Sequence, residues 1–183
     1  MKEKEMIQQI KNGDVRAFRE LYDLYFDYAI RVATIIMNHQ RSNATDAVQE
    51  TFIRVYQNIQ SYDTSRPFKA WFYRILINEC NRILKRDGKI LSVGEIMVET
   101  KNDGQMGEDI SRFTEYESLY SAIESLEQHH RIPIVLKYLN GFKEKEIAEI
   151  LNENINTIKS RLYKGKQKLK RLLQTEKGGS QNG

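Results

Sequence analysis

Residues 141–171, GFKEKEIAEILNENINTIKSRLYKGKQKLKR, have the pattern of two short helices joined by a tight turn. In the second helix, apolar or small residues recur at three- and four-residue steps and form a stripe that would face a core. This stripe comprises Ile158, Leu162, Gly165, Leu169, Leu172 and Leu173. At about 100° per residue, the opposite face carries Asn156, Lys159, Ser160, Tyr163, Lys164 and Gln167. A helix-turn-helix presents such a face to the DNA major groove.

The charge of this segment separates that interpretation from a simpler one, a helical hairpin with a lysine-rich solvent face. Between Asn154 and Gln174 there are seven Lys or Arg and no Asp or Glu. A solvated helix usually mixes both signs and gains spaced ion pairs, whereas a phosphate-facing helix gains from one sign only. The asymmetry favours nucleic acid as the partner. We expect Asn156 to cap the second helix after a turn at residues 152–154.

Composition limits the remaining possibilities. The 183 residues are 40% hydrophobic, enough for a buried core, and carry a formal net charge of +4. Acidic residues gather in the segment 91–110, as expected of a connector in a nucleic-acid binder. Cys80 is the only cysteine, which excludes an internal disulfide and fits a reducing compartment. The chain has no apolar run of about 18 residues and a polar start, so we expect a cytoplasmic protein without membrane insertion.

Helical periodicity covers most of the chain and predicts an all-α fold of two small domains. In the first domain we expect a long helix from residue 15, capped by Asp14, and a second helix with Asn43 or Thr45 near its start. A third helix should follow the loop at residues 61–67. The predicted organisation is a first domain at 1–88, a flexible acidic linker at 89–111, a second domain at 112–174 and a disordered tail at 175–183.

The third helix contains a further pattern, FKAWFYRILINECNRILKR at residues 68–86, in which Trp71, Phe72 and Tyr73 stand near several cations. Aromatic and basic side chains together suit single strands, because unstacked bases can lie on aromatic faces or enter pockets. The simpler interpretation places most of these aromatics in the core. Asn78, Asn81 and Arg82 are harder to explain by packing, since they lie on the polar side of the same helix.

Four blocks of the sequence together resemble the extracytoplasmic-function sigma factors of the sigma-70 family, the small two-domain initiation subunits of bacterial RNA polymerase. The blocks are GDVRAFRELYDLYFDYA (13–29), TDAVQETFIRVYQNI (45–59), FKAWFYRILINECNR (68–82) and NTIKSRLYKGKQKL (156–169), in the order and spacing of that family. Two positions depart from its pattern: Phe72 replaces a more usual leucine and Gly165 a more usual alanine. Glycine within that helix should cost about 1 kcal/mol relative to alanine.

The resemblance implies functions for individual residues. The polar face of the second helix is similar to the docking surface for the β′ coiled coil of core polymerase, and includes Asp46, Gln49, Glu50, Ile53 and Arg54. The resemblance implies that the first domain is a σ2-like helical bundle. Its loop and third helix resemble the elements that melt and capture the minus-ten promoter element. The residues concerned are Ser61, Asn78, Asn81, Arg82, Lys85 and Arg86. The second, σ4-like domain would read the minus-thirty-five duplex with Asn156, Thr157, Lys159, Ser160, Arg161, Tyr163, Lys164 and Gln167.

The same resemblance implies core RNA polymerase, with its β′ coiled coil and β flap, and promoter DNA as partners, together with an anti-sigma factor. It implies a role in transcription initiation at a specific regulon, such as a stress response, and no cofactor.

Two other classes of protein account for the sequence less well. A ligand-sensing, dimeric helix-turn-helix regulator would bind duplex DNA without polymerase, but it has no need for the aromatic and basic third helix. An enzyme finds little support, because the sequence shows no nucleophile, phosphate loop or paired carboxylates. The adjacent His129 and His130 should point about 100° apart on a helix, and no third metal ligand has convincing spacing. We therefore expect neither catalytic residues nor a metal site.

Overall fold

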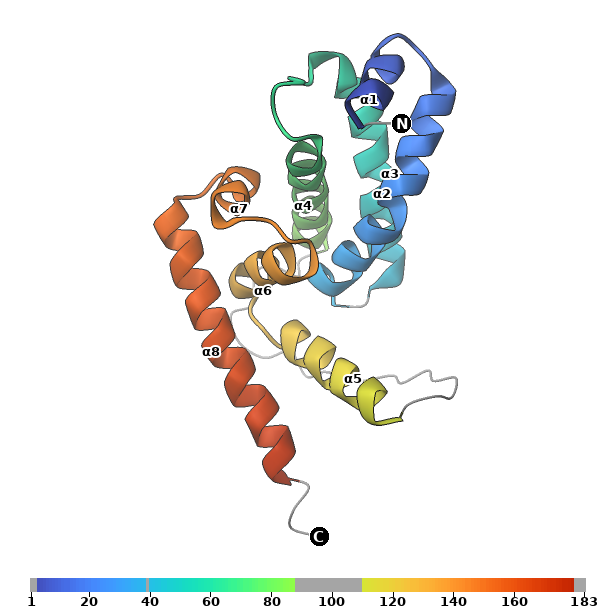
Figure 1. Ribbon diagram of the computed structural model, residues 1–183. Coiled ribbons are helices and arrows are strands. Elements are labelled where there is room, and N and C mark those ends of the chain that lie inside the picture. The colour runs from blue at the N-terminus through green and yellow to red at the C-terminus, as the bar shows by residue number, and fades with distance from the viewer. Residues whose placement is uncertain (1–2, 39, 88–109, 180–183) are drawn as a thin grey trace.

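The computed structural model describes residues 3–38, 40–87 and 110–179, and all regular secondary structure in these ranges is helical (Figure 1). This confirms the predicted all-α class. Below, the N-terminal half means residues 3–87 and the C-terminal half means residues 110–179. Residues 1–2, residue 39, residues 88–109, which hold most of the expected linker, and residues 180–183 lie outside the described residues.

The N-terminal half is a bundle of four α-helices. These are α1 (Glu3–Lys11), α2 (Val15–Ile36), α3 (Arg41–Asn58), followed by the 3₁₀ turn η1 (Ile59–Ser61), and α4 (Phe68–Arg86). As predicted, Asp14 caps α2, because its carboxylate accepts hydrogen bonds from the backbone N–H groups of Arg16 and Ala17 at 2.8 and 3.4 Å. A side-chain acceptor at this position satisfies amides that lack a partner within the helix.

Aromatic side chains fill the centre of this bundle. The Phe72 side chain is completely buried, and its ring lies 4.8 Å from that of Tyr25 on α2 and 5.3 Å from that of Phe52 on α3. Burying one such side chain stabilises a fold by about 1.5–3 kcal/mol. The structure thus explains how phenylalanine at this position is accommodated, and it assigns Phe72 and Tyr73 to the core.

One element of this half was not predicted. The helix α1 was missed, although Met6, Ile7 and Ile10 form a short apolar face that is buried against the bundle. The helix α3 starts at Arg41, so Asn43 lies near its start, as expected. The Asn43 amide donates a 2.8 Å hydrogen bond to Asp87 Oδ2 and joins the start of α3 to the end of α4.

The C-terminal half contains α5 (Ile110–Glu124), α6 (Gln128–Ile134) with the π-helical turn η2 (Val135–Leu139), α7 (Glu144–Leu151) and α8 (Ile155–Gly179). The helices α7 and α8 form the predicted helix-turn-helix. The boundaries of this half differ at both ends. The helix α5 begins two residues inside the expected linker, and α8 includes residues 175–179 of the expected tail. Good helix-forming residues such as Gln174, Glu176 and Lys177 continue α8 in that region.

The turn between α7 and α8 depends on two asparagines. Asn152 has a φ of +52°, a left-handed conformation that asparagine tolerates better than most residues, and it ends α7. Asn154 Oδ1 accepts a 2.8 Å hydrogen bond from the backbone N–H of Asn156. The cap of α8 is therefore Asn154 rather than the predicted Asn156, because the helix already begins at Ile155.

The two halves are in contact, with α4 lying against α7 and α2 against α5 and α6. Lys69 Nζ on α4 donates a 2.7 Å hydrogen bond to the carbonyl of Asn140, and the rings of Tyr73 and Phe142 meet edge to face at 5.3 Å. Figure 1 shows α7 beside α4 and α8 running along the outer side of the C-terminal half. The helix α4 therefore serves both as a bundle helix and as part of the contact between halves.

The buried Arg131 side chain of α6 also crosses between the halves. Its Nη1 donates to the carbonyl of Ile36, at 3.2 Å, and to the side chain of Asn38. The last carbonyls of a helix lack partners within it and carry partial negative charge, so a cation there is favourable. Burial lowers the pKa of Arg131 to about 10, which leaves the guanidinium charged at neutral pH.

Candidate nucleic-acid and protein interfaces

The reading face of α8, defined by Asn156, Lys159, Ser160, Tyr163, Lys164 and Gln167, is exposed to solvent. Tyr163 is 67% exposed, which is unusual for an aromatic side chain packed in a domain, whereas Ile158 and Leu162 on the opposite side are buried. This polarity follows the helical period in the sequence. The exposed side can lie in a major groove without disturbing the core.

Two of the predicted DNA contacts on α8 are less accessible than the rest. Thr157 is half-buried, and Arg161 forms a 3.0 Å ion pair with Glu153 in the turn. The pair links the first turns of α8 to the loop before it. Arg161 is thus held against the protein, while Lys159 and Lys164 are on the exposed surface.

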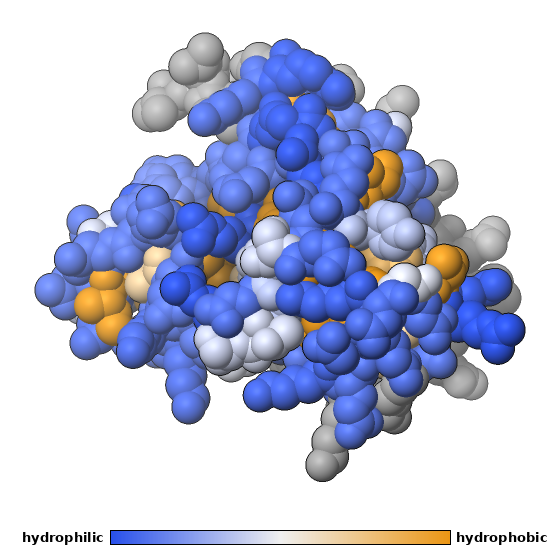
Figure 2. All heavy atoms as spheres, turned by 90° about the horizontal axis from the view of Figure 1, so that it is seen from above, coloured by the Kyte–Doolittle hydropathy of each residue, from blue (hydrophilic) through white to orange (hydrophobic). Residues whose placement is uncertain are grey.

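The face of α3 that carries the predicted protein contacts combines polar and apolar side chains. Asp46 and Gln49 are exposed, Glu50 is half-buried, and Ile53 is 50% exposed. An isoleucine with this exposure, one turn from polar groups, can contribute apolar area to a protein interface while its neighbours set specificity. We call Asp46, Gln49, Glu50 and Ile53 the α3 face. Figure 2 shows a mainly hydrophilic surface from above, with apolar side chains in small groups.

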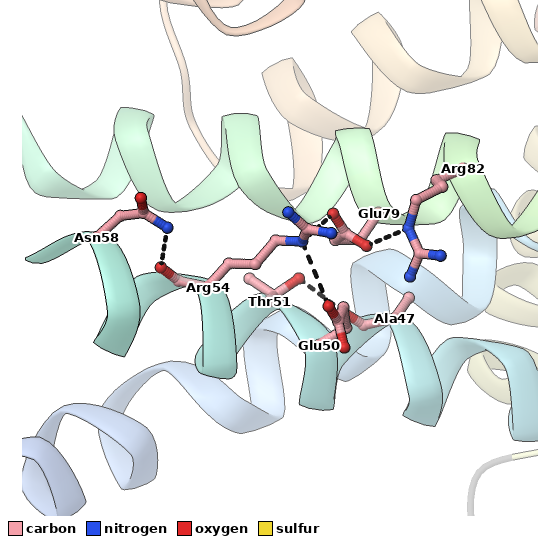
Figure 3. Close-up of polar contacts among 7 residues, drawn as sticks. All are labelled: Ala47, Glu50, Thr51, Arg54, Asn58, Glu79 and Arg82. Atoms are coloured by element: carbon pink, nitrogen blue, oxygen red, sulfur yellow. Dashed lines mark hydrogen bonds and ion pairs between the residues drawn. The ribbon is translucent and has the colours of Figure 1, made fainter.

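Arg54, the fifth residue predicted on α3, is bound within the protein. Figure 3 shows its guanidinium beside Glu79 of α4, with Nε 2.5 Å from Glu79 Oε1 and 3.4 Å from Glu50 Oε1. The other carboxylate oxygen of Glu79 accepts a 2.7 Å hydrogen bond from Arg82 Nε. Glu79 raises the pKa of Arg82 through this bond and its charge. Glu79 was not identified as important from the sequence. The available signal was its spacing from Arg82, because opposite charges three residues apart on a helix can pair.

The residues predicted to contact the minus-ten strand are in different environments on α4. Asn78, Lys85 and Arg86 are exposed. Asn81 is half-buried, and its Oδ1 accepts a 2.8 Å hydrogen bond from the amide of Gln128 on α6. Asn81 is therefore engaged by the C-terminal half, a contact that helical periodicity cannot predict.

The loop before α4 is held by side chains from several elements. Tyr62 is buried, with its ring 4.8 Å from that of Trp71 and its hydroxyl donating to the Arg66 carbonyl at 2.5 Å. From α1, Lys11 Nζ donates a 2.7 Å hydrogen bond to the carbonyl of Tyr62. The exposed Ser61 hydroxyl donates to the carbonyl of Asn58 at 2.9 Å. The unpredicted helix α1 thus fixes the loop that the sequence associates with strand capture.

None of the described helices combines the length and the apolar content that are needed to cross a bilayer.

Comparison with known proteins agrees with this architecture. Residues 18–90 match the family model described as Sigma-70 region 2, and residues 116–169 match Sigma-70, region 4. The ECF RNA polymerase sigma factor SigW of Bacillus subtilis is 33% identical over 180 residues, covering 93% of this chain and 96% of that protein. The ECF RNA polymerase sigma-E factor of Haemophilus influenzae is 27% identical over 180 residues, covering 92% and 94%.

Two solved structures share the fold. The structure of CnrH in complex with the cytosolic domain of CnrY has a TM-score of 0.69 at 22% identity, covering 94% of this chain and 97% of that chain. The sigma factor RpoE in complex with the anti-sigma factor NepR from Bartonella quintana has a TM-score of 0.68 at 24% identity, covering 87% and 98%.

An exposed basic recognition helix and a second helical bundle with a mixed polar and apolar face define a DNA-binding transcription protein with a protein partner. The similarity over nearly the full length specifies the class. This chain belongs to the ECF RNA polymerase sigma factors of the sigma-70 family. It directs RNA polymerase in promoter recognition and transcription initiation, and it is not an enzyme. This excludes the alternative of a ligand-sensing regulator that acts without polymerase.

Proposed function

We propose that the α3 face is the surface that docks on the β′ coiled coil of core polymerase. The observation that supports this proposal is the exposed Ile53 between polar side chains on a helix whose other side is buried. Arg54, which was also predicted on the docking surface, connects α3 to α4 through Glu79. It contributes to docking by fixing the orientation of the α3 face.

The proposed promoter contacts are divided between the N-terminal and C-terminal halves. Asn78, Arg82, Lys85 and Arg86 on α4, with Ser61 at the loop, bind the melted minus-ten strand. Asn81 joins them once its contact with Gln128 is released. In the C-terminal half, the reading face of α8 reads the minus-thirty-five duplex, and its basic neighbours contact phosphates. The matched family regions, 18–90 and 116–169, fall within the proposed first and second domains, at 1–88 and 112–174, except for two residues.

An anti-sigma factor is a further partner that we propose. Both structural relatives were solved in complex with another protein, which in one of them is described as an anti-sigma factor. The polymerase is a cytoplasmic machine in bacteria, so the cytoplasm is the proposed site of action. The β flap of polymerase is the proposed contact for the C-terminal half.

Binding to purified core polymerase tests the docking proposal. We expect Asp46→Lys to weaken core binding by at least about tenfold, because an interface charge reversal costs several kcal/mol when desolvated. Gln49→Ala should also weaken core binding, because it removes a polar side chain from the same face. Asp27→Lys, a charge reversal at an exposed position on α2, is the matched control and should bind normally. Far-ultraviolet circular dichroism checks the fold of each variant. Unchanged core affinity in both α3 variants would remove this surface from the model.

A further inference from the structure

The start of α6 brings together three side chains that can bind a metal ion, Glu127, His129 and His130. Glu127 Oε2 lies 3.3 Å from His129 Nε2 and 3.3 Å from His130 Nδ1. The two imidazole rings are 4.0 Å apart between centroids. All three ligand atoms lie within 4.8 Å of one another. Neither docking to polymerase nor DNA reading, as proposed above, uses these groups.

The position of this cluster in its helix explains why the sequence did not reveal it. Side chains on an α-helix lean toward the N-terminus, and Glu127 is the N-cap residue of α6. The two histidines lie in the first turn, so both rings lean over the Glu127 side chain. The expectation that neighbouring histidines diverge by about 100° holds for their Cα–Cβ directions but does not keep the rings apart.

The distances fit a tetrahedral ion. Zinc binds imidazole nitrogen and carboxylate oxygen at about 2.0–2.1 Å, which places neighbouring ligand atoms of a tetrahedron about 3.3 Å from each other. Glu127 Oε2 has this spacing to both histidine nitrogens. A carboxylate and two imidazoles also match the ligand preference of divalent zinc, cobalt and nickel, and not that of magnesium or calcium.

The hydrogen bonding around the cluster leaves the ligand atoms available. His130 is 4% exposed, and its Nδ1 faces Glu127 Oε2 at 3.3 Å without forming a hydrogen bond to any of the described residues. A buried nitrogen that faces a carboxylate in this way is placed to bind an ion between the two groups. Lys168 Nζ of α8 lies 2.9 Å from Glu127 Oε1 and orients the carboxylate so that Oε2 faces the rings.

We propose that Glu127, His129 and His130 form a binding site for a divalent transition-metal ion such as zinc, with one coordination position open to solvent. Both histidines also line a shallow hollow with Asn156, Ser160 and Lys164 of α8. The open position therefore lies next to the proposed reading face, where water or a phosphate oxygen can complete the coordination. The site belongs to the free chain, so the proposal does not depend on DNA binding.

The chain has three histidines, and the third, His39, is not among the proposed ligands, so a direct test is possible. The experiment titrates zinc chloride into the full-length, chelator-treated protein and follows the imidazole carbon–proton signals by nuclear magnetic resonance. We expect zinc to shift the signals of His129 and His130, while the His39 signal stays in place. The signals that are lost in His129→Ala and in a His130 variant identify these two residues. Magnesium chloride at the same concentration should move none of them.

Isothermal titration with zinc then compares variants. His129 and Glu127 are more than half exposed, so His129→Ala and Glu127→Gln should fold normally. Each should weaken zinc binding by more than about tenfold, as loss of even an outer-shell group does at metal sites. His39→Ala is the matched control and should retain full affinity. Unchanged affinity in both site variants, loss of binding in His39→Ala, or the absence of zinc binding at millimolar concentration would overturn the proposal.

Discussion

Arg54 Nε on α3 lies 2.5 Å from Oε1 of Glu79, a buried carboxylate on α4. The helix with the proposed polymerase-docking face and the helix with the proposed strand-capturing residues are therefore joined by an ion pair. The same carboxylate holds Arg82. Glu79 therefore links the proposed docking helix to Arg82, one of the residues proposed to bind the melted strand.

The first prediction concerns the strength of this connection. Glu79→Ala should lower the free energy of unfolding by about 1–2 kcal/mol, less than for a fully buried pair, because both arginines are half-exposed and can be hydrated. A double-mutant cycle of Arg54→Ala with Glu79→Ala, measured by urea unfolding, should give a coupling energy of at least about 0.5 kcal/mol. Additive changes in the free energy of unfolding would show that the interaction between the two side chains does not stabilise the fold.

Gly165 leads to a second prediction. A Cβ atom at this position would lie 3.1 Å from Ile134 Cγ1 and 3.5 Å from His130 Cβ, so α8 approaches α6 closely there. Gly165→Ala should gain about 1 kcal/mol in helix propensity. The contact with the buried Ile134 should offset most of that gain. We expect a change in unfolding free energy of less than about 0.5 kcal/mol, measured by urea unfolding, whereas overpacking by Gly165→Val should destabilise by about 1–3 kcal/mol. Stabilisation by the full propensity gain would show that Ile134 moves aside freely.

The sequence predicted those features that depend on local pattern. The period of apolar residues identified α2, α3, α4 and the helix-turn-helix, and the cap at Asp14 was read correctly. The turn asparagines were recognised, but the cap was placed at Asn156 instead of Asn154, because pattern alone fixes a helix start only to within a few residues. The short helix α1 was missed, since its apolar face has only three buried residues.

Features that depend on distant parts of the chain could not be read in this way. Asn81 meets Gln128 across 47 positions, and Lys11 meets Tyr62 across 51. No helical period relates such residues. The histidine cluster shows a third limit, because the ring positions depend on how side chains lean within one turn and not on their spacing in sequence.

A third prediction follows from the contact between the two halves. Promoter elements near positions minus ten and minus thirty-five are about 25 base pairs apart, which is about 85 Å of duplex at 3.4 Å per pair. A compact chain of this length has a radius of gyration of about 16 Å, so the halves must separate to reach both elements. Removing Lys69 and Gln128, which donate hydrogen bonds across the contact, should favour the open form.

Small-angle X-ray scattering of the free protein checks this. The double variant Lys69→Ala, Gln128→Ala should have a larger radius of gyration than the wild type and an equal or higher affinity for core polymerase. Lys85→Ala, another exposed lysine of α4, is the control and should leave the radius unchanged. A double variant as compact as the wild type would mean that these two bonds do not hold the halves together.

A fourth prediction separates base reading from phosphate contact on α8. Ser160→Ala or Lys164→Ala should change selectivity at particular minus-thirty-five base pairs, each contact being worth about 1–3 kcal/mol. Lys170→Ala should weaken all sequences alike and lower the slope of binding against salt by about 1. Binding of the polymerase holoenzyme to a set of base-substituted promoters measures both effects. Equal losses on every promoter for all three variants would contradict the assignment of Ser160 and Lys164.

The last prediction concerns strand opening. Asn78 is exposed on α4, and the loop before this helix is held by the hydrogen bond from Lys11 to the Tyr62 carbonyl. Capturing a flipped base requires a fitted pocket, because unstacking costs a few kcal/mol. Asn78→Ala should remove a contact to the captured strand, and Lys11→Ala should loosen the loop. Both should reduce promoter opening more than closed-complex formation, while Lys4→Ala, an exposed lysine of the same helix α1, should do neither.

Permanganate footprinting of promoter thymines measures the opening, and a gel shift on the same holoenzyme measures the closed complex. On a premelted template the defect of Lys11→Ala should shrink most, because the bubble no longer has to be opened and held by an ordered loop. Part of the Asn78→Ala defect should remain, since that variant also loses direct affinity for the strand. Normal opening in both variants, or an equal defect in closed-complex formation, would show that α4 and its loop are not the melting element.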